Sequence, residues 1–388
     1  MNLLRASALT LGLCTGLAAL AAPARAQDEE DPFLQEPAPA PAPRGERREP
    51  ERKVIELDPR TLQSIKRGLD FLARRQEANG AYVDRIGRKI NNTYHATPGQ
   101  HVGVTALAGM AFLSCGSTPG RGPYGLQVRR CVDFVRTCVD PQGFINHEGS
   151  RMYSHAFGTL FLAEVYGMAP STEVRDALRR AVKLIVSAQN EQGGWRYLPG
   201  AKDSDISISV CQVQALRAAN NVGIQVPKET IDAAIRYVKK SYIGAGANFQ
   251  SHPGGFWYQV YENYPFRPSR TSFALTAAGV TALYGAGEYD GAEIRGGLRY
   301  LFDSRNRPPK NDMHCTFDYF YGHYYAMQGM FQAGEPYWSQ WYPAVRDEIL
   351  SGQHQDGRWE DLVGPNYATA MACVILQIPT RYLPIFER

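Results

Sequence analysis

Two aspartates separated by one residue are the first candidates for acid–base chemistry. They stand in the sequence DSDI, residues 203–206, as Asp203 and Asp205. A carboxyl group that its surroundings keep protonated can donate a proton to a substrate. The pair also lies directly before an apolar helical stretch, where aspartate is a favoured N-cap. We therefore predict helix capping as the main role of the pair and keep catalysis as the alternative.

The second candidate region is aromatic. FDYFYGHYY, residues 317–325, has six aromatic residues in nine positions, together with the acid–base candidates Asp318 and His323. Aromatic rings on a cavity wall can stack on sugars, line an apolar pocket or stabilise a cation. The preceding stretch, 254–270, adds further rings and two arginines, which suit a phosphate or carboxylate. The predicted cavity residues of the two stretches are Trp257, Tyr258, Arg267, Arg270, Phe317, Tyr319, Tyr321 and Tyr324.

A metal site has weaker support. Asp318 and His323 are five residues apart, an awkward spacing for one helix face, and zinc needs three or four converging ligands. We predict no metal cofactor and keep zinc as a minor alternative.

A repeated motif indicates the elements that must position these residues. Gln-x-x-x-Gly-x-aromatic starts at Gln76, Gln189 and Gln353, and weaker copies lie between them. Each copy follows an amphipathic helical pattern and precedes a mostly apolar one. The amphipathic segments are near 60–76, 124–138, 172–189, 228–242, 290–303 and 337–352, and the apolar segments are near 101–115, 154–168, 206–221, 271–286, 318–333 and 366–378. The pattern predicts an all-α fold, an (α/α)6 toroid in which six inner helices are surrounded by six outer helices.

The motif itself is predicted to be scaffold. Its glycine would stop the outer helix, its aromatic ring would pack over the turn, and its glutamine would bond exposed backbone. In such a ring the first turns of the inner helices would line the mouth of a central cavity. The residues expected there include Tyr94, His101, Ser154, His155, Asp203, Asp205, Arg267, Arg270, Asp318, His323 and Tyr367.

At 189–195 and 353–359 the motif resembles the QW motif of the squalene and oxidosqualene cyclases, whose fold is shared with protein prenyltransferases. The resemblance covers about 54–380 and implies an α/α toroid of the prenyltransferase/squalene-cyclase repeat type, with an isoprenoid-like ligand. Two signatures of that superfamily are incomplete: DSDI lacks the last acid of Asp-x-Asp-Asp, and the sequence after residue 26 has no Asp-x-Cys. Neither activity is carried over.

The N-terminal 53 residues are not expected to join the fold. Arg5, an apolar run and Ala24-Arg25-Ala26 predict a signal peptide at 1–26, and therefore export to the periplasm or the medium. Residues 27–53 are rich in proline and charge and predict a disordered linker, so the toroid domain would span 54–388. No other segment is apolar enough to cross a membrane.

Charge excludes one class of partner. The formal net charge is +4, and Arg5 and Arg25 supply two of these charges, so +2 remains after cleavage. Without a basic stripe, nucleic acid is not an expected partner. Three functions stay open: an exported protein that binds or transforms an apolar, isoprenoid-like small molecule; a non-catalytic envelope scaffold with a protein partner; and a carbohydrate-active (α/α)6 enzyme, which would need paired carboxylates.

Overall fold

Helices alternate between two sequence types along the chain, and this alternation builds the molecule. The computed structural model describes residues 52–90, 93–245, 252–261, 269–303, 305–309 and 318–387, which belong to one compact unit, 37–388. The predicted signal peptide, nearly all of the linker, Arg267 and Phe317 lie outside the described residues, as does the side chain of Asp318.

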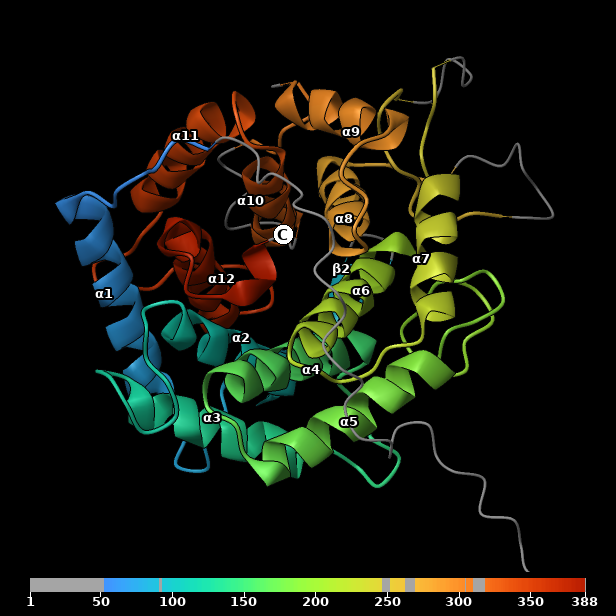
Figure 1. Ribbon diagram of the computed structural model, residues 1–388. Coiled ribbons are helices and arrows are strands. Elements are labelled where there is room, and N and C mark those ends of the chain that lie inside the picture. Colours follow the sequence, from blue (N-terminus) through green and yellow to red (C-terminus); the bar gives the residue numbers. More distant parts are fainter. Residues whose placement is uncertain are drawn as a thin grey trace, which may run out of the picture. The chain divides into compact units, whose positions relative to one another are not determined.

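The described part holds twelve α-helices in two concentric rings (Figure 1). The outer helices are α1 (Pro59–Arg75), α3 (Gly125–Thr137), α5 (Thr172–Ser187), α7 (Lys228–Lys240), α9 (Ala292–Phe302) and α11 (Tyr337–Ser351). The inner helices are α2 (Val102–Leu113), α4 (Met152–Met168), α6 (Ile206–Asn221), α8 (Phe273–Gly285), α10 (Asp318–Ala333) and α12 (Pro365–Gln377). Each inner helix packs on the next, and α12 packs on α2, so the ring closes. The predicted (α/α)6 toroid is confirmed, with helix bounds within a few residues of those expected.

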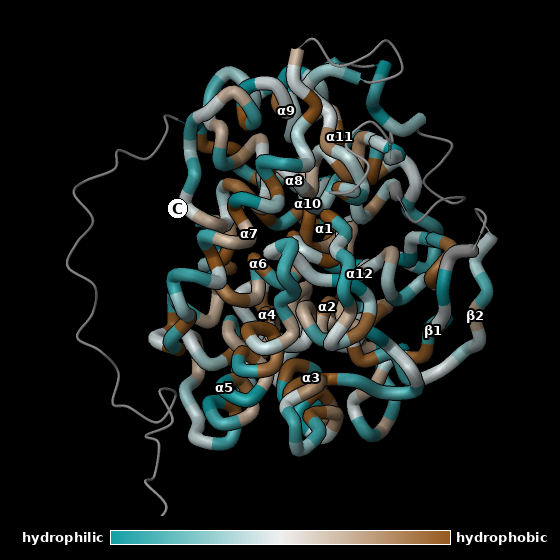
Figure 2. Tube along the Cα trace, turned by 90° about the vertical axis from the view of Figure 1, so that its right-hand side faces the viewer, coloured by the Kyte–Doolittle hydropathy of each residue, from teal (hydrophilic) through white to brown (hydrophobic). Residues whose placement is uncertain are grey.

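Burial explains the two helix types. Every residue of α2 is buried, since the helix is surrounded by other helices on all sides. The outer helix α5 buries only one face, through residues such as Val174, Leu178 and Ile185. In Figure 2 the apolar segments correspondingly run inside and the polar ones outside. No helix of the described residues has both the length and the apolar character to span a bilayer.

The repeated motif joins neighbouring outer helices. The Gln189 side-chain amide donates to the Gly193 carbonyl in its own turn and to the Thr230 carbonyl in α7, both at 2.9 Å. Gln353 makes the same pair of bonds to Gly357 and to Ser64 of α1. The aromatic residue also bonds back, because the Trp195 indole donates to the Ile185 carbonyl at 2.8 Å. The scaffold role of the motif is therefore explained by hydrogen bonds across the outer ring.

The motif glycine has a different role from the one predicted. Helix α5 ends at Ser187, and Gly193 lies six residues beyond that end, in the following turn, with φ of 87°. A side chain there would also clash with the carbonyl oxygen of Ala233 in α7. Gly357 is placed against Arg67 of α1 in the same way. The glycine allows the turn to touch the next outer helix and does not end its own helix.

One element was not predicted. Strands β1 (Val83–Ile90) and β2 (Thr93–Gln100) pair as an antiparallel hairpin with Val83 opposite Gln100. The hairpin and the C-terminus lie at opposite ends of the toroid (Figure 2).

The C-terminal residues close the end of the ring opposite the hairpin. After α12, two short 3-10 helices, η2 (Ile378–Thr380) and η3 (Pro384–Phe386), lead the chain across this end, with η3 against α6 and α10. The Gln332 amide donates to the Phe386 carbonyl, and Arg217 donates to that of Glu387. The space beside Ile385 is about 10 Å³, enough for about one water molecule.

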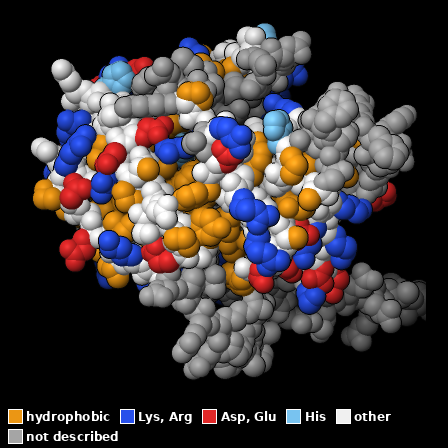
Figure 3. All heavy atoms as spheres, turned by 90° about the horizontal axis from the view of Figure 1, so that it is seen from above, with side chains coloured by type: hydrophobic (Ala, Val, Ile, Leu, Met, Phe, Trp, Pro, Cys, Tyr) orange, Lys and Arg blue, Asp and Glu red, His pale blue; other side chains and the backbone are white. Residues whose placement is uncertain are grey.

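The described cysteines form no disulfide, and the surface carries charges of both signs (Figure 3). The five described cysteines are free thiols, and Cys315 lies outside the described residues. Figure 3 looks onto the side of the toroid that carries α9 and α11. Apolar side chains gather near its centre, and positive and negative groups are interspersed around them.

Candidate functional site

A cavity lies where the N-terminal turns of all six inner helices meet. Its volume is about 410 Å³. Every inner helix contributes at least one lining residue from its first two turns or its N-cap, for example His101, Ser154, Ser207, Leu275 and Tyr367. The hairpin forms a further part of the wall through Ile86, Gly87, Arg88 and Tyr94. The cavity is therefore at the hairpin end of the toroid, where the sequence predicted a mouth.

The predicted site residues divide into two groups. His101, Arg270, Tyr321 and Tyr367 line the cavity, as do Tyr94 and Ser154. The others do not line it: Asp203, Asp205, His155, Trp257, Tyr258, Tyr319, His323 and Tyr324.

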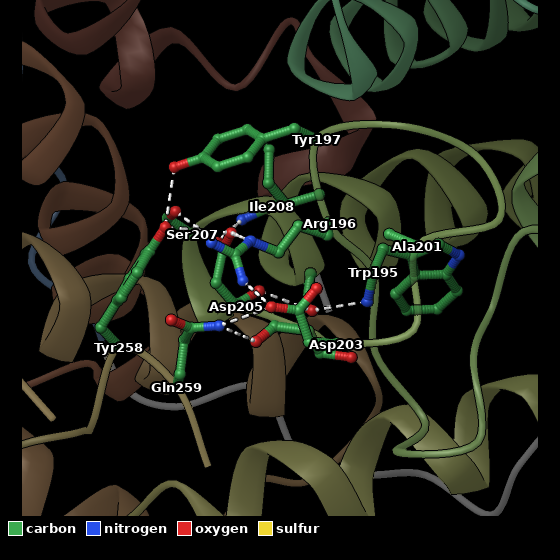
Figure 4. Close-up of polar contacts among 12 residues, drawn as sticks. Trp195, Arg196, Tyr197, Ala201, Asp203, Asp205, Ser207, Ile208, Tyr258 and Gln259 are labelled. Atoms are coloured by element: carbon green, nitrogen blue, oxygen red, sulfur yellow. Dashed lines mark hydrogen bonds and ion pairs between the residues drawn. The ribbon is translucent and has the colours of Figure 1, made fainter. Parts of the chain in front are cut away.

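Asp205 is held behind the cavity wall. It caps α6 by accepting from the Ile208 amide at 2.9 Å, as predicted, and it accepts from the Ser207 hydroxyl at 2.6 Å. The Tyr258 hydroxyl donates to its second oxygen at 3.3 Å, and Arg196 lies 3.5 Å away (Figure 4). Burial raises the pKa of this carboxyl, while these partners act against the rise. Ser207, which lines the cavity, is the residue through which Asp205 reaches it.

Asp203 is different from its neighbour. Its side chain is 58% exposed, pairs with Arg196 and accepts from the Gln259 amide at 3.1 Å (Figure 4). Arg196 stands between the carboxylates of Asp203 and Asp205 and contacts both. The described geometry therefore makes Asp205 the only member of the pair with a route to the cavity.

His155 has a scaffold contact that sequence reasoning did not find. Its Nδ1 accepts from the Ile145 amide at 3.0 Å. In other repeats the same turn bonds to a hydroxyl, for example Trp195 to Ser209 and Trp359 to Thr369. Burial lowers the pKa of His155 to about 3, so the ring is neutral. The sequence could have indicated this contact, since His155 stands four residues after the N-cap of α4, as Ser209 does after the N-cap of α6.

The aromatic stretch on α10 is divided between wall and core. Tyr321 lines the cavity and donates to the Ser207 carbonyl at 2.9 Å. Tyr319 is buried and bonds Glu348 of α11. His323 packs between Phe273 and Tyr319, and neither ring nitrogen has a partner among the described residues. No group of three potential metal ligands converges in the described part of the chain.

Asp84 fixes the base of the hairpin to α12. This carboxylate accepts from the Tyr367 amide at 2.7 Å and from the Asn366 side chain at 3.2 Å. Helix α12 has no capping side chain of its own, so Asp84 supplies the cap from another element. The cap holds the hairpin wall in place over the cavity.

Asp84 should make stability depend on pH. Burial raises its pKa to about 7, above the value of about 3.9 in an unfolded chain. The folded state thus keeps a proton that the unfolded state has released, and the free energy of unfolding falls as pH rises from about 4 to about 7. Asp84→Asn should remove that part of the decrease, up to roughly 4 kcal/mol for three pKa units. Urea midpoints of both proteins across pH 4–8 measure the difference.

Asp133→Asn, at an exposed position in α3, is the matched control and should leave the pH profile unchanged. Parallel profiles for wild type and Asp84→Asn would contradict a raised pKa at this site.

Comparison with known proteins supports the fold. No protein-family model matches the chain, and no curated protein sequence matches it. Among solved structures, a cellobiose 2-epimerase from Bacillus thermoamylovorans superposes with a TM-score of 0.60 at 14% identity, over 82% of this chain and 99% of its own. An unsaturated glucuronyl hydrolase specific for heparin gives 0.58 at 11%, over 84% and 97%.

A type II terpene cyclase, MstE from Scytonema, is also similar. A variant of it in complex with geranylgeranyl dihydroxybenzoate gives a TM-score of 0.52 at 12% identity, over 84% of this chain and 98% of its own. At these identities the likeness shows the (α/α)6 fold, which the terpene cyclase shares with the carbohydrate-active enzymes.

Proposed function

We propose that the toroid binds a largely apolar, isoprenoid-like small molecule in the cavity at the hairpin end. The observation that carries this proposal is the lining itself. Apolar and aromatic side chains from five inner helices, among them Val104, Leu107, Phe157, Leu275 and Tyr321, surround a space of a size usual for small-molecule sites. The bound ligand of the terpene cyclase, a molecule with a geranylgeranyl group, is consistent with it.

Catalysis on the ligand would depend on Asp205. It is buried, its pKa is raised, and it contacts the cavity-lining Ser207 at 2.6 Å. A proton from Asp205 would have to pass through that hydroxyl. We therefore propose ligand binding as the function. If the protein is also an enzyme, Asp205 is the proposed proton donor.

A carbohydrate-active function is less well supported, because the described lining of the cavity has no pair of carboxyl groups. Glycosidases use two carboxyl groups that flank the sugar bond. No aspartate or glutamate is among the described residues that line the cavity, and Asp203 and Asp205 lie outside it.

Native mass spectrometry of the purified chain, without chelator, tests the proposal. A retained polyprenyl or triterpene mass is expected. It should be lost in Ala274→Trp, which fills the cavity from α8, and kept in Leu126→Trp, at an exposed position on α3. A retained oligosaccharide would contradict the proposal, and so would a protein that takes up neither natural lipid nor added squalene. The same spectrum reports zinc.

We also propose export, because the apolar run before Ala26 has the form of a signal peptide. N-terminal sequencing of the protein from its native cells should find Gln27 first, whereas Met1 as first residue would contradict cleavage.

A further inference from the structure

The cavity contains positive charges without a matching acid. Arg88 of β1, Arg151 at the start of α4 and Arg270 before α8 are among its lining residues. None of them forms an ion pair within the described part of the chain, and no carboxylate is among the described lining residues. Unpaired guanidinium groups beside an apolar space favour a negative ligand group.

Two of these arginines are held by a pair of tyrosines. The Arg270 guanidinium lies 4.2 Å from the centre of the Tyr258 ring, and that of Arg151 lies 5.6 Å from the Tyr197 ring. The two tyrosine hydroxyls are hydrogen-bonded to each other at 2.7 Å. Aromatic faces orient a guanidinium without cancelling its charge. The arrangement therefore holds two cations at one side of the cavity and leaves both able to bind an anion.

Arg196 contacts the same tyrosine as Arg151, but its charge is paired with carboxylates. It also lies over the Tyr197 ring, at 5.3 Å, but Asp203 and Asp205 neutralise it. Arg151 and Arg270 have the rings without the acids. Arg196 therefore stabilises the wall, whereas Arg151 and Arg270 keep charges at the cavity that are unpaired among the described residues.

Neutral donors complete the polar surface. The Ser154 residue is 2% exposed and lines the cavity, and its hydroxyl has no partner in the described structure. His101 is neutral, since burial lowers its pKa to about 4, and its Nδ1 accepts from the Val104 amide at 3.4 Å. The ring proton is then on Nε2, as a further donor. These groups donate hydrogen bonds, which an anionic oxygen accepts.

We propose that the natural ligand is an anionic amphiphile, with a phosphate or carboxylate group held by Arg151 and Arg270, assisted by Arg88, and an apolar body against Val104, Leu107 and Leu275. This inference rests on the proposed function, because it assigns the head group of the molecule that the apolar cavity would hold. A neutral hydrocarbon would leave the arginines without a partner.

Calorimetric titration with three probes of equal chain length tests the head group. Dodecyl phosphate, dodecanoate and dodecan-1-ol are titrated below their aggregation concentrations. The wild type should bind at least one anion roughly 10- to 100-fold more tightly than the alcohol, the range that charge-assisted hydrogen bonds supply. Which anion is preferred distinguishes a phosphate source from a carboxylate source. The preference should weaken as salt increases.

Variants assign the preference to the arginines. The double variant Arg151→Gln and Arg270→Gln should lose it while binding the alcohol within about twofold of wild type. Lysine at both positions should restore most of it, because the charge is kept. Arg236→Gln, at an exposed position on α7, is the control and should change nothing. Unchanged thermal unfolding of the double variant excludes loss of the fold.

The two proposals fail in different ways. Equal binding of alcohol and anions by wild type, or a preference that survives the double variant, overturns the anionic head group and leaves the apolar site intact. Absence of binding by all three probes overturns both.

Discussion

Trp359→Ala should destabilise the toroid by about 3–5 kcal/mol, the cost of removing a large buried aromatic side chain. The Trp359 side chain is fully buried, and its indole donates to the Ile349 carbonyl at 2.7 Å. A Cβ on Gly68 of α1 would lie 2.9 Å from its ring, so the ring packs directly on the first helix. Trp359, which follows the last outer helix α11, thus contacts the first outer helix α1 and closes the outer ring. Chemical denaturation gives the free energy of unfolding.

Trp359→Phe is the matched control. It keeps most of the apolar contact and loses one hydrogen bond and part of the volume, so a loss of about 1–2 kcal/mol is expected. Trp195→Ala should resemble Trp359→Ala, since Trp195 is buried and bonds the Ile185 carbonyl in the same way. If Trp359→Ala cost no more than Trp359→Phe, the ring would not be closed by this contact.

Asp205→Ala should cost about 2–4 kcal/mol. The substitution removes the cap of α6, worth about 1 kcal/mol, and leaves the buried donors on Ile208 and Ser207 without their acceptor. Asp205→Asn should cost only about 1 kcal/mol, because an amide oxygen can still accept from the Ile208 amide. Thermal and urea unfolding compare the two.

The neighbouring aspartate provides the control for Asp205. Asp203→Ala removes an exposed charge and should change stability by no more than about 0.5 kcal/mol. Equal losses at both positions would mean that the buried network around Asp205 contributes little. Asp205→Asn has a second use: it folds but cannot donate the proton that an enzymatic function would require, so any turnover of a bound ligand should stop.

The fold could be predicted because its determinants are local and repeated. Helical periodicity separates one-sided helices such as α5 from helices buried on all sides such as α2. Gln189 and Gln353 mark equivalent turns, so one copy informs the others. The partner of each glutamine, on the next outer helix, could not be read from spacing alone.

The site was less predictable because it depends on contacts between distant segments. Asp84 acquires its role only when the hairpin meets α12, 283 residues away. Arg151 has no local motif and becomes a cavity residue only through ring closure and Tyr197. His155 has a residue type that suggests catalysis, yet it occupies a position where other repeats carry serine or threonine. Its position in the repeat, which residue type does not reveal, is the one that indicates the observed scaffold contact with Ile145.

The C-terminal segment makes the two ends of the toroid different, since it covers one end and the cavity lies at the other. Phe386 and Glu387 are hydrogen-bonded across the far end of the ring, and the space beside Ile385 there holds about one water molecule. A ligand of the proposed kind would therefore enter and leave the cavity at the end formed by the β1–β2 hairpin. If the proposed ligand binds there, release of one molecule would have to precede binding of the next at the same end of the toroid.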